Sequence, residues 1–452
     1  MNNSSKNIRV EIQRLSHKGK GCATIDNRAV EVSGALPGDV VDVVVVSKRR
    51  HTARVRLERI VEEGIDRINA ECCHYGRCGG CVWQNVPYQE QCRLKKELVE
   101  TALDSIPGGY HFEETDIVPS PDQFFYRNKM EFSFDSPPKE DRIIKLGLHE
   151  AGRYDRVFDL KQCLLQSELS NRIVKATGDY VRSNELSVYG LKSHKGLLRY
   201  LMVRDGKKTG DLMVNLVTSG DDFPLLEHYA GHVRAEIPEI TTILRSINSG
   251  RASVAVGEEH ETVSGDGVIT DRIGQFLFTI SPDSFFQTNT SQAYNLYETI
   301  RSYCGLDGTQ RLLDLYSGTG TIGIFCSDGA ASVTGVEMVE SAVYDARRNA
   351  EFNEVSNCTF ISGTVEKILG EDLDDFDVVI CDPPRAGIHP KAMHRLLQMR
   401  IPRMVYISCN IKALPADLEM LFMAGYRIRK VKVFDMSPHT PHVETVVLLD
   451  IL

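Results

Sequence analysis

Beyond Gln287 the sequence alternates short apolar runs with helix-length amphipathic stretches, and this rhythm restricts the fold more than any other feature of the chain. The runs are RLLDLY, SVTGVE, CTFISG, FDVVICD and RMVYIS, and then VKVFDM and VETVVLLD. Compact apolar runs separated by helices are typical of parallel strands buried on both faces. The last two runs have only a short connection, so they can pair antiparallel. We therefore expect a doubly wound α/β sheet that ends in an antiparallel hairpin.

A glycine-rich turn, SGTGTIG, follows the first run and opens a helix. It places Tyr316 and Gly318 where a ligand meets the carboxyl end of the first strand. Such a turn alone also serves dinucleotides, or is only a tight turn. No Gly-Lys-Ser/Thr is present there to bind a triphosphate, and Glu337 ends the second run, where an acid can bind both ribose hydroxyls of an adenosine.

A second motif, CDPPRAG, begins at Cys381 directly after the run FDVVI. Its order after DLYSGTGT and Glu337 resembles that of class I S-adenosylmethionine-dependent methyltransferases. The resemblance implies that Asp382 faces the methyl donor and the target base, whereas the structural alternative is a Pro-Pro turn that only caps a strand. Enzymes that methylate exocyclic amino groups usually have an aromatic residue where this chain has Arg385. Methylation of an adenine or guanine amino group is therefore disfavoured.

Two further residues fit methylation of a pyrimidine carbon. Carbon 5 of uracil is a poor nucleophile, so its methylation needs a thiolate that adds to carbon 6 and a base that later removes a proton. Cys409 ends the run RMVYIS within ISCN, and Glu444 lies in PHTPHVE, where the final hairpin returns to the same edge of the sheet. A lone Cys or Glu at a strand end is usually structural.

The motifs SCN, DPPRAG, FFQTN and HTPHVE together resemble the RNA uracil-5-methyltransferase family, over essentially the whole chain. In that family the Cys of SCN is the nucleophile and the Glu of HVE is the base, so the resemblance implies these roles for Cys409 and Glu444. It also implies S-adenosyl-L-methionine as cofactor. The residues expected to bind that cofactor are Gln287, Tyr316, Gly318, Glu337 and Asp382.

The chain departs from the family after Asn410. The family usually continues with Pro and a downstream Arg-Asp, whereas this chain has Ile411 and then Pro-Ala-Asp at residues 415–417. Because Cys409 is retained, we expect the same chemistry with an altered loop. Cys381 precedes DPP on a buried strand, and we interpret it as an inert core thiol.

The N-terminus differs in charge from the rest of the chain. Residues 1–61 carry twelve Lys and Arg against six Asp and Glu, a net charge of +6, whereas the whole chain has −9. This segment contains five short alternating runs, which predict a small closed barrel. The sequences KGKG and ALPGD resemble a TRAM domain, an OB-like module that binds RNA. A solvated basic face is the alternative explanation of the charge.

We expect three domains: residues 1–62 as the TRAM barrel, 63–285 as a mixed α/β middle domain with a helix at Tyr88–Leu103, and 286–452 as the catalytic domain.

No stretch approaches the roughly 18 apolar residues that a membrane span needs, and the N-terminal residues MNNSSKNIRV contain no apolar signal core. The sequence predicts a cytoplasmic protein without an obligate protein partner, most simply a monomer.

Cysteines cluster in ECCHYGRCGGC, and one more follows in DLKQCLL. A Cys-x5-Cys-x2-Cys run with one distant Cys supplies four thiolates, which suits a [4Fe–4S] cluster or a zinc ion; buried thiols without metal are the third interpretation. The family resemblance favours the iron–sulfur cluster, with Cys73 as a bystander. The ligands would be Cys72, Cys78, Cys81 and Cys163. The spacing differs from the Cys-x3-Cys-x2-Cys of radical S-adenosylmethionine enzymes, so we reject radical methylation.

The target uridine must be single-stranded or flipped out, because a base inside a duplex cannot reach Cys409. The run FFYRNK offers Phe124, Phe125 and Tyr126 beside Arg127 as stacking residues, although such a stripe is more often core. Within the family, a TRAM domain with a metal cluster is similar to the enzymes of 23S ribosomal RNA, so transfer RNA is the less favoured substrate. Alternatives are RNA cytosine-5 methylation and a non-catalytic iron–sulfur protein that binds RNA or assists ribosome assembly.

Overall fold

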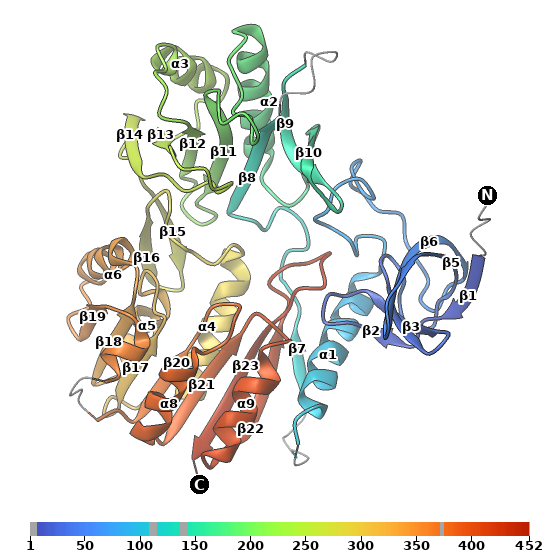
Figure 1. Ribbon diagram of the computed structural model, residues 1–452. Coiled ribbons are helices and arrows are strands. Elements are labelled where there is room, and N and C mark those ends of the chain that lie inside the picture. Colours follow the sequence, from blue (N-terminus) through green and yellow to red (C-terminus); the bar gives the residue numbers. More distant parts are fainter. Residues whose placement is uncertain (1–6, 108–114, 136–142, 371–374, 452) are drawn as a thin grey trace.

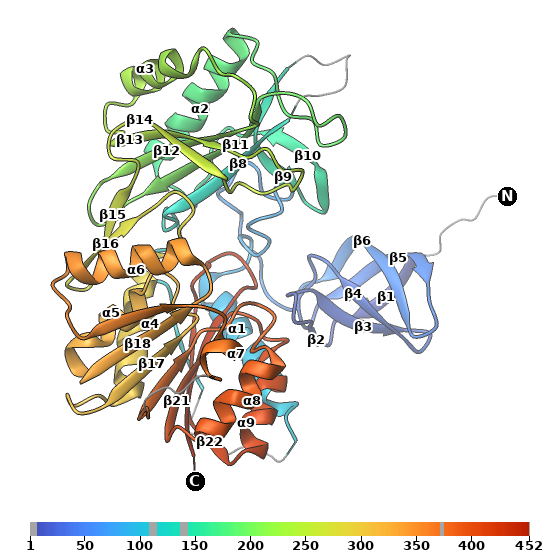
Figure 2. The same ribbon diagram turned by 60° about the vertical axis from the view of Figure 1, so that its left-hand side comes forward.

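The computed structural model describes residues 7–107, 115–135, 143–370 and 375–451. The chain forms three parts, each built on its own sheet, with a two-stranded hairpin between the second and third parts (Figure 1). The N-terminal sheet stands to one side, beside the cyan helix α1 (Figures 1 and 2).

The N-terminal part is a six-stranded sheet of order β1-β5-β6-β4-β3-β2, curled around a small apolar core that includes Val30, Val32, Val41 and Val43. Its strands are β1 (Asn7–Glu11), β2 (Arg14–Leu15), β3 (Gly21–Ile25), β4 (Arg28–Val32), β5 (Val40–Lys48) and β6 (Thr52–Glu62). The predicted N-terminal barrel is confirmed as a half-barrel of six strands instead of five, because the first apolar run forms both β1 and β2. These two edge strands are not paired with each other in the described chain.

The middle part has seven strands in the order β10-β9-β8-β11-β12-β13-β14. All neighbours are antiparallel except β12 and β13, as predicted for a sheet dominated by antiparallel strands. Helices α2 (Glu168–Ser183) and α3 (Leu226–Glu236) bury their apolar sides against it (Figure 2). The strands are β8 (Lys129–Asp135), β9 (Lys145–Glu150), β10 (Arg153–Asp159), β11 (Leu198–Asp205), β12 (Leu212–Thr218), β13 (Thr242–Ile247) and β14 (Glu259–Ser264).

The C-terminal sheet has the order β19-β18-β17-β20-β21-β23-β22-β7. Its strands are β7 (Asp116–Val118), β17 (Arg311–Leu315), β18 (Ser332–Glu337), β19 (Cys358–Ser362), β20 (Val378–Cys381), β21 (Arg403–Ser408), β22 (Tyr426–Phe434) and β23 (Glu444–Ile451). Strands β17 to β21 are parallel, and β23 runs antiparallel to both β21 and β22. The predicted terminal hairpin is therefore confirmed.

Helices cover both faces of this sheet, as a doubly wound fold requires. The helices α4 (Thr290–Cys304), α5 (Thr321–Cys326), which runs into η1 (Ser327–Gly329), and α6 (Glu340–Phe352) pack on one face together with the hairpin of β15 (Ile269–Ile273) and β16 (Phe276–Ile280). The other face carries α1 (Tyr88–Asp104), α7 (Val365–Ile368), α8 (Pro390–Met399) and α9 (Leu414–Met423). This is the class I methyltransferase fold, so the predicted fold class is confirmed.

Helix α1 and strand β7 belong to the middle segment by sequence, yet they pack against the C-terminal sheet. The division of the chain at residues 62 and 285 stays a proposal for this reason. Within the described ranges, no helix has the length and apolar character needed to cross a membrane.

Candidate active site

The predicted nucleophile and base lie at the ends of two neighbouring strands. Ser408 at the end of β21 is opposite Thr445 in β23, so Cys409 and Glu444 come next along the two antiparallel strands. Glu444 is buried and Cys409 is half-buried. The structure therefore brings together two residues that the sequence only placed at the same edge.

Burial and charge set the protonation of this pair. The pKa of Cys409 is raised to about 11, chiefly by burial and then by Glu444 and Asp382, while Arg385 opposes the rise. Burial also raises the pKa of Glu444, again opposed by Arg385. The pKa of Asp382, which follows β20, rises to about 7 because the carboxyl is desolvated. One thiol and two carboxyl groups thus share a water-poor site, in which Arg385 is a cation that favours the charged forms of Cys409 and Glu444.

The glycine-rich turn has a backbone conformation that favours glycine and is open at Gly318. Gly318 and Gly320 have φ of 54° and 76°, and a Cβ on Gly320 would lie 2.7 Å from the ring of Phe360. Gly318 donates its N–H to Oε2 of Glu337 at 3.1 Å, which orients that carboxylate towards the turn. A Cβ on Gly318 would meet nothing within 4 Å, so the turn leaves open space there.

Several polar atoms around this turn are buried without a partner. Among the described residues these include the hydroxyl of Ser317 and one carboxyl oxygen of Asp314. Buried polar groups are normally hydrogen-bonded, so these atoms fit a pocket whose ligand completes them. Tyr316 has a φ of 64°, an unusual conformation for a tyrosine at a strand end.

Gln287 lies in the segment that enters α4. Its carbonyl accepts a hydrogen bond from the Nδ2 amide of Asn128 at 2.7 Å. Nearby, the hydroxyl of Thr319 in the glycine-rich turn donates to the carbonyl of Phe285 at 3.4 Å. The segment carrying Gln287 is therefore beside the turn that carries Gly318.

The altered loop after Asn410 is hydrogen-bonded to the DPPRAG motif and to the residues that follow it. The Nδ2 amide of Asn410 donates to the carbonyl of Arg385 at 2.6 Å. Oδ2 of Asp417 accepts the Tyr406 hydroxyl at 2.6 Å and the N–H of Ile388 at 3.0 Å. Asp417 thus connects the strand that ends before Cys409 with the turn after DPPRAG.

The loop that leads to Glu444 depends on residues that sequence reasoning missed. Lys95 of α1 forms a fully buried ion pair with Asp435 and donates to the carbonyl of Ser437 at 3.0 Å. Gln91 of the same helix accepts the N–H of His439 at 2.8 Å. In the sequence, the only indication of this ion pair is that Lys95 falls on the apolar side of an amphipathic helix. That position does not show which acidic residue is its partner.

The three predicted stacking aromatics have different surroundings. Phe124 stacks on His439, with 4.5 Å between the ring centroids, and Tyr126 is buried with its hydroxyl donating to the carbonyl of Pro438. Only Phe125 is exposed. Cys381 is fully buried and its pKa is raised by burial, which agrees with an inert core thiol.

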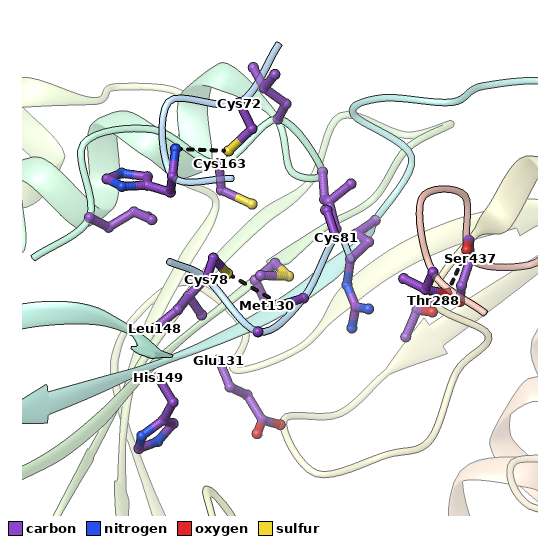
Figure 3. Close-up of a pocket in the computed structure, with 18 of the residues that line it drawn as sticks. Cys72, Cys78, Cys81, Met130, Glu131, Leu148, His149, Cys163, Thr288 and Ser437 are labelled. Atoms are coloured by element: carbon purple, nitrogen blue, oxygen red, sulfur yellow. Dashed lines mark hydrogen bonds between the residues drawn. The ribbon is translucent and has the colours of Figure 1, made fainter. Parts of the chain in front are cut away.

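The four predicted metal ligands line one end of a cavity of about 970 Å³ between the middle part and the loop of residues 437–442 (Figure 3). The pKa of Cys81 is raised to about 12, chiefly by burial and then by the three other thiols. Cys73 is exposed and does not line this cavity. Cys409 and Glu444 do not line it, but the cavity reaches the segments next to the strand-end site, since His442 of the loop before Glu444 and Phe286 and Thr288 on either side of Gln287 line it.

Backbone N–H groups point at two of these sulfurs. His74 donates to Sγ of Cys72 and Gly80 donates to Sγ of Cys78, both at 3.4 Å. Among the described residues no group of three or more His, Cys, Asp or Glu is arranged to hold a metal ion. The four thiols therefore line one cavity without forming a metal site in the described structure.

Comparisons with known proteins agree with this geometry. Residues 5–57 match the TRAM domain, and residues 250–451 match the family described as tRNA (Uracil-5-)-methyltransferase. Uncharacterized RNA methyltransferases of Chlorobaculum tepidum and Clostridium acetobutylicum are each 37% identical, with 94% and 97% of this chain and 92% and 96% of those proteins covered. The crystal structure of Pyrococcus abyssi tRNA (uracil-54, C5)-methyltransferase with S-adenosyl-L-homocysteine is similar at a TM-score of 0.78 and 29% identity, covering 98% of this chain and all of that one.

Proposed function

The chain belongs to the RNA uracil-5-methyltransferase family, and from this premise we propose that it modifies a uridine of 23S ribosomal RNA, with Cys409 as nucleophile and Glu444 as base. Methylation of uracil carbon 5 in RNA with S-adenosylmethionine is its activity. The observation that carries the proposed roles is the pairing of the strand ends, which sets Cys409 beside Glu444 with Asp382 next to both.

The chemistry follows from these side chains. The Cys409 thiolate forms a bond to carbon 6 of the uracil, and the ring electrons then make carbon 5 nucleophilic. When bound, S-adenosylmethionine supplies the methyl group that carbon 5 takes up. Glu444 then removes the proton from carbon 5, the bond from carbon 6 to sulfur breaks, and the thiolate is restored.

The environment of each group suits its role. Because the pKa of Cys409 is about 11, the free enzyme holds it as a thiol at neutral pH. The thiol releases its proton to solvent before it attacks, and Arg385 is the cation that favours the resulting thiolate. A buried carboxylate such as Glu444 is a strong proton acceptor, since burial disfavours its charged form. We propose that Gln287, Tyr316, Gly318, Glu337 and Asp382 hold the cofactor.

Ribosomal RNA is proposed as the substrate because a TRAM domain and a four-cysteine cavity occur together in this chain. In a strain that lacks the gene, we expect one or more 5-methyluridines of 23S ribosomal RNA to disappear while transfer RNA is unchanged. Mass spectrometry of RNA fragments, with complementation by the wild-type gene, measures this directly. Loss of 5-methyluridine from transfer RNA alone, or of 5-methylcytidine instead, would contradict the proposal.

We propose that Cys72, Cys78, Cys81 and Cys163 hold a [4Fe–4S] cluster. Protein purified without oxygen should then contain about four iron and four sulfide per chain, with a broad visible absorption that disappears on oxidation. Cys81→Ser should lose iron and sulfide, whereas the control Cys73→Ser should keep both, because Cys73 is exposed and away from the cavity. Zinc without sulfide in the wild-type protein would refute the cluster.

A further inference from the structure

The segment of residues 281–288 is held between two parts of the molecule. It joins β16 to α4 and carries both the exposed Phe285 and Gln287. On the catalytic side, Oδ2 of Asp345 in α6 accepts the hydroxyls of Ser281 at 2.8 Å and Ser284 at 2.5 Å. Further along the segment, Thr319 donates to the carbonyl of Phe285, and Phe286 is buried in the core on the same side.

The middle part holds the same segment through Arg204, near the end of β11. Its guanidinium donates twice to the carbonyl of Pro282, at 3.2 and 3.0 Å, and once to the carbonyl of Ser284 at 2.5 Å. Asn128, directly before β8, donates its backbone N–H to the carbonyl of Thr288 at 2.9 Å. Together with the side-chain bond from Asn128 to Gln287, these contacts follow the segment along its length.

Arg204 is an unusual residue for this position, because it is only 2% exposed and forms no salt bridge among the described residues, although Asp283 and Glu131 are near enough to favour its charged form. Burying a guanidinium without a paired anion is costly. In return, its rigid fork fixes the direction of two carbonyl groups at once, which neither Lys nor an apolar side chain can reproduce. The contacts indicate that the precise path of the segment matters.

We propose that Arg204 is a positioning residue for the cofactor pocket, and that it couples the middle sheet to the methyltransferase site by fixing residues 281–288. This inference rests on the proposed role of Gln287 as a cofactor contact. Thr319 of the glycine-rich turn is hydrogen-bonded to the carbonyl of Phe285 in this segment. A shift of the segment would therefore disturb that bond and move Gln287 relative to the turn. Small displacements of positioning groups have large effects on binding and rate.

The chain offers a matched control on the same strand. Arg199, at the other end of β11, is also buried and donates to the carbonyls of Asn248, Gly250 and Ala252 at 2.6, 2.6 and 2.5 Å. It therefore resembles Arg204 in burial and bonding but holds a loop that contains none of the proposed cofactor residues. Substituting either arginine with Lys keeps the charge and removes the fork.

We expect Arg204→Lys to weaken binding of S-adenosylhomocysteine by about tenfold and to raise the KM for S-adenosylmethionine to a similar extent, with a smaller change in kcat. Arg199→Lys should bind like wild type, even where thermal unfolding shows a comparable loss of stability. Isothermal titration calorimetry of the full chain measures the binding without any need for turnover.

Normal binding in Arg204→Lys, or equal weakening in both arginine variants, would overturn the inference. Gln287→Ala, measured in parallel, separates the inference from its premise. Weak binding in Gln287→Ala with normal binding in Arg204→Lys refutes the inference alone. Normal binding in Gln287→Ala refutes the assignment of Gln287, and the inference with it.

Discussion

Cys409→Ala should lose methylation by at least about 10⁴-fold, because no other group can form the bond to carbon 6 that makes carbon 5 nucleophilic. Binding of S-adenosylhomocysteine should stay close to wild type, since the cofactor residues proposed above do not include Cys409. Incorporation of labelled methyl groups into RNA, followed under single-turnover conditions, measures the loss of the chemical step itself.

The matched control is Cys381→Ala, which removes the other thiol near the DPP motif. Cys381 is fully buried at the end of β20, so its sulfur cannot reach a uracil ring, and burial raises its pKa. We expect this variant to lose some stability through the small cavity it creates, while its rate of methyl transfer remains within the same order as wild type. If Cys409→Ala still turned over and Cys381→Ala did not, the nucleophile would have been assigned to the wrong strand.

The position of the nucleophile could be predicted because it follows from local pattern. Compact apolar runs identified the parallel strands, and the carboxyl ends of parallel strands meet at one edge. Asp382 and Cys409 directly follow two adjacent strands, so their proximity needed no knowledge of side-chain packing. Glu444 required only the return of the terminal hairpin, which its short connection already indicated.

The residues that hold these groups in place could not be predicted in the same way. Lys95 and Asp435 are 340 positions apart in the chain, and Arg204 is 78 positions from the carbonyl that it holds. A buried ion pair or a buried arginine looks like an ordinary charged residue until the partner segment is known. The strand β7 escaped prediction for a related reason, since only three residues pair with β22 and they arrive from another part of the chain.

The run FFYRNK contains aromatic residues with different uses, which its sequence does not distinguish. Phe124 and Tyr126 are occupied by contacts with the loop of residues 437–442, so they support the loop that leads to Glu444. Only Phe125 presents its side chain to solvent, with an unusual φ of 55°. Aromatic side chains cannot be assigned to core or ligand from a short run alone, because both uses have the same local pattern.

Glu444→Gln should stop the reaction after methyl transfer. Gln has nearly the same shape but cannot accept a proton, so carbon 5 keeps its hydrogen and the bond from carbon 6 to Cys409 cannot be expelled. We therefore expect RNA to remain covalently attached to the protein and to carry the new methyl group. Denaturing electrophoresis with RNA labelled in its backbone, and in parallel with a labelled methyl donor, detects both features of the adduct.

The double variant Cys409→Ala with Glu444→Gln is the control, because it lacks the sulfur to which the RNA would be joined and should give no adduct. An adduct without the methyl label would mean that the reaction stops before methyl transfer, and Glu444 would then act at an earlier step. Release of free 5-methyluridine RNA at a rate near that of wild type would exclude Glu444 as the base. Asp382 would then become the strongest remaining acceptor, since it is the other carboxyl group that raises the pKa of Cys409.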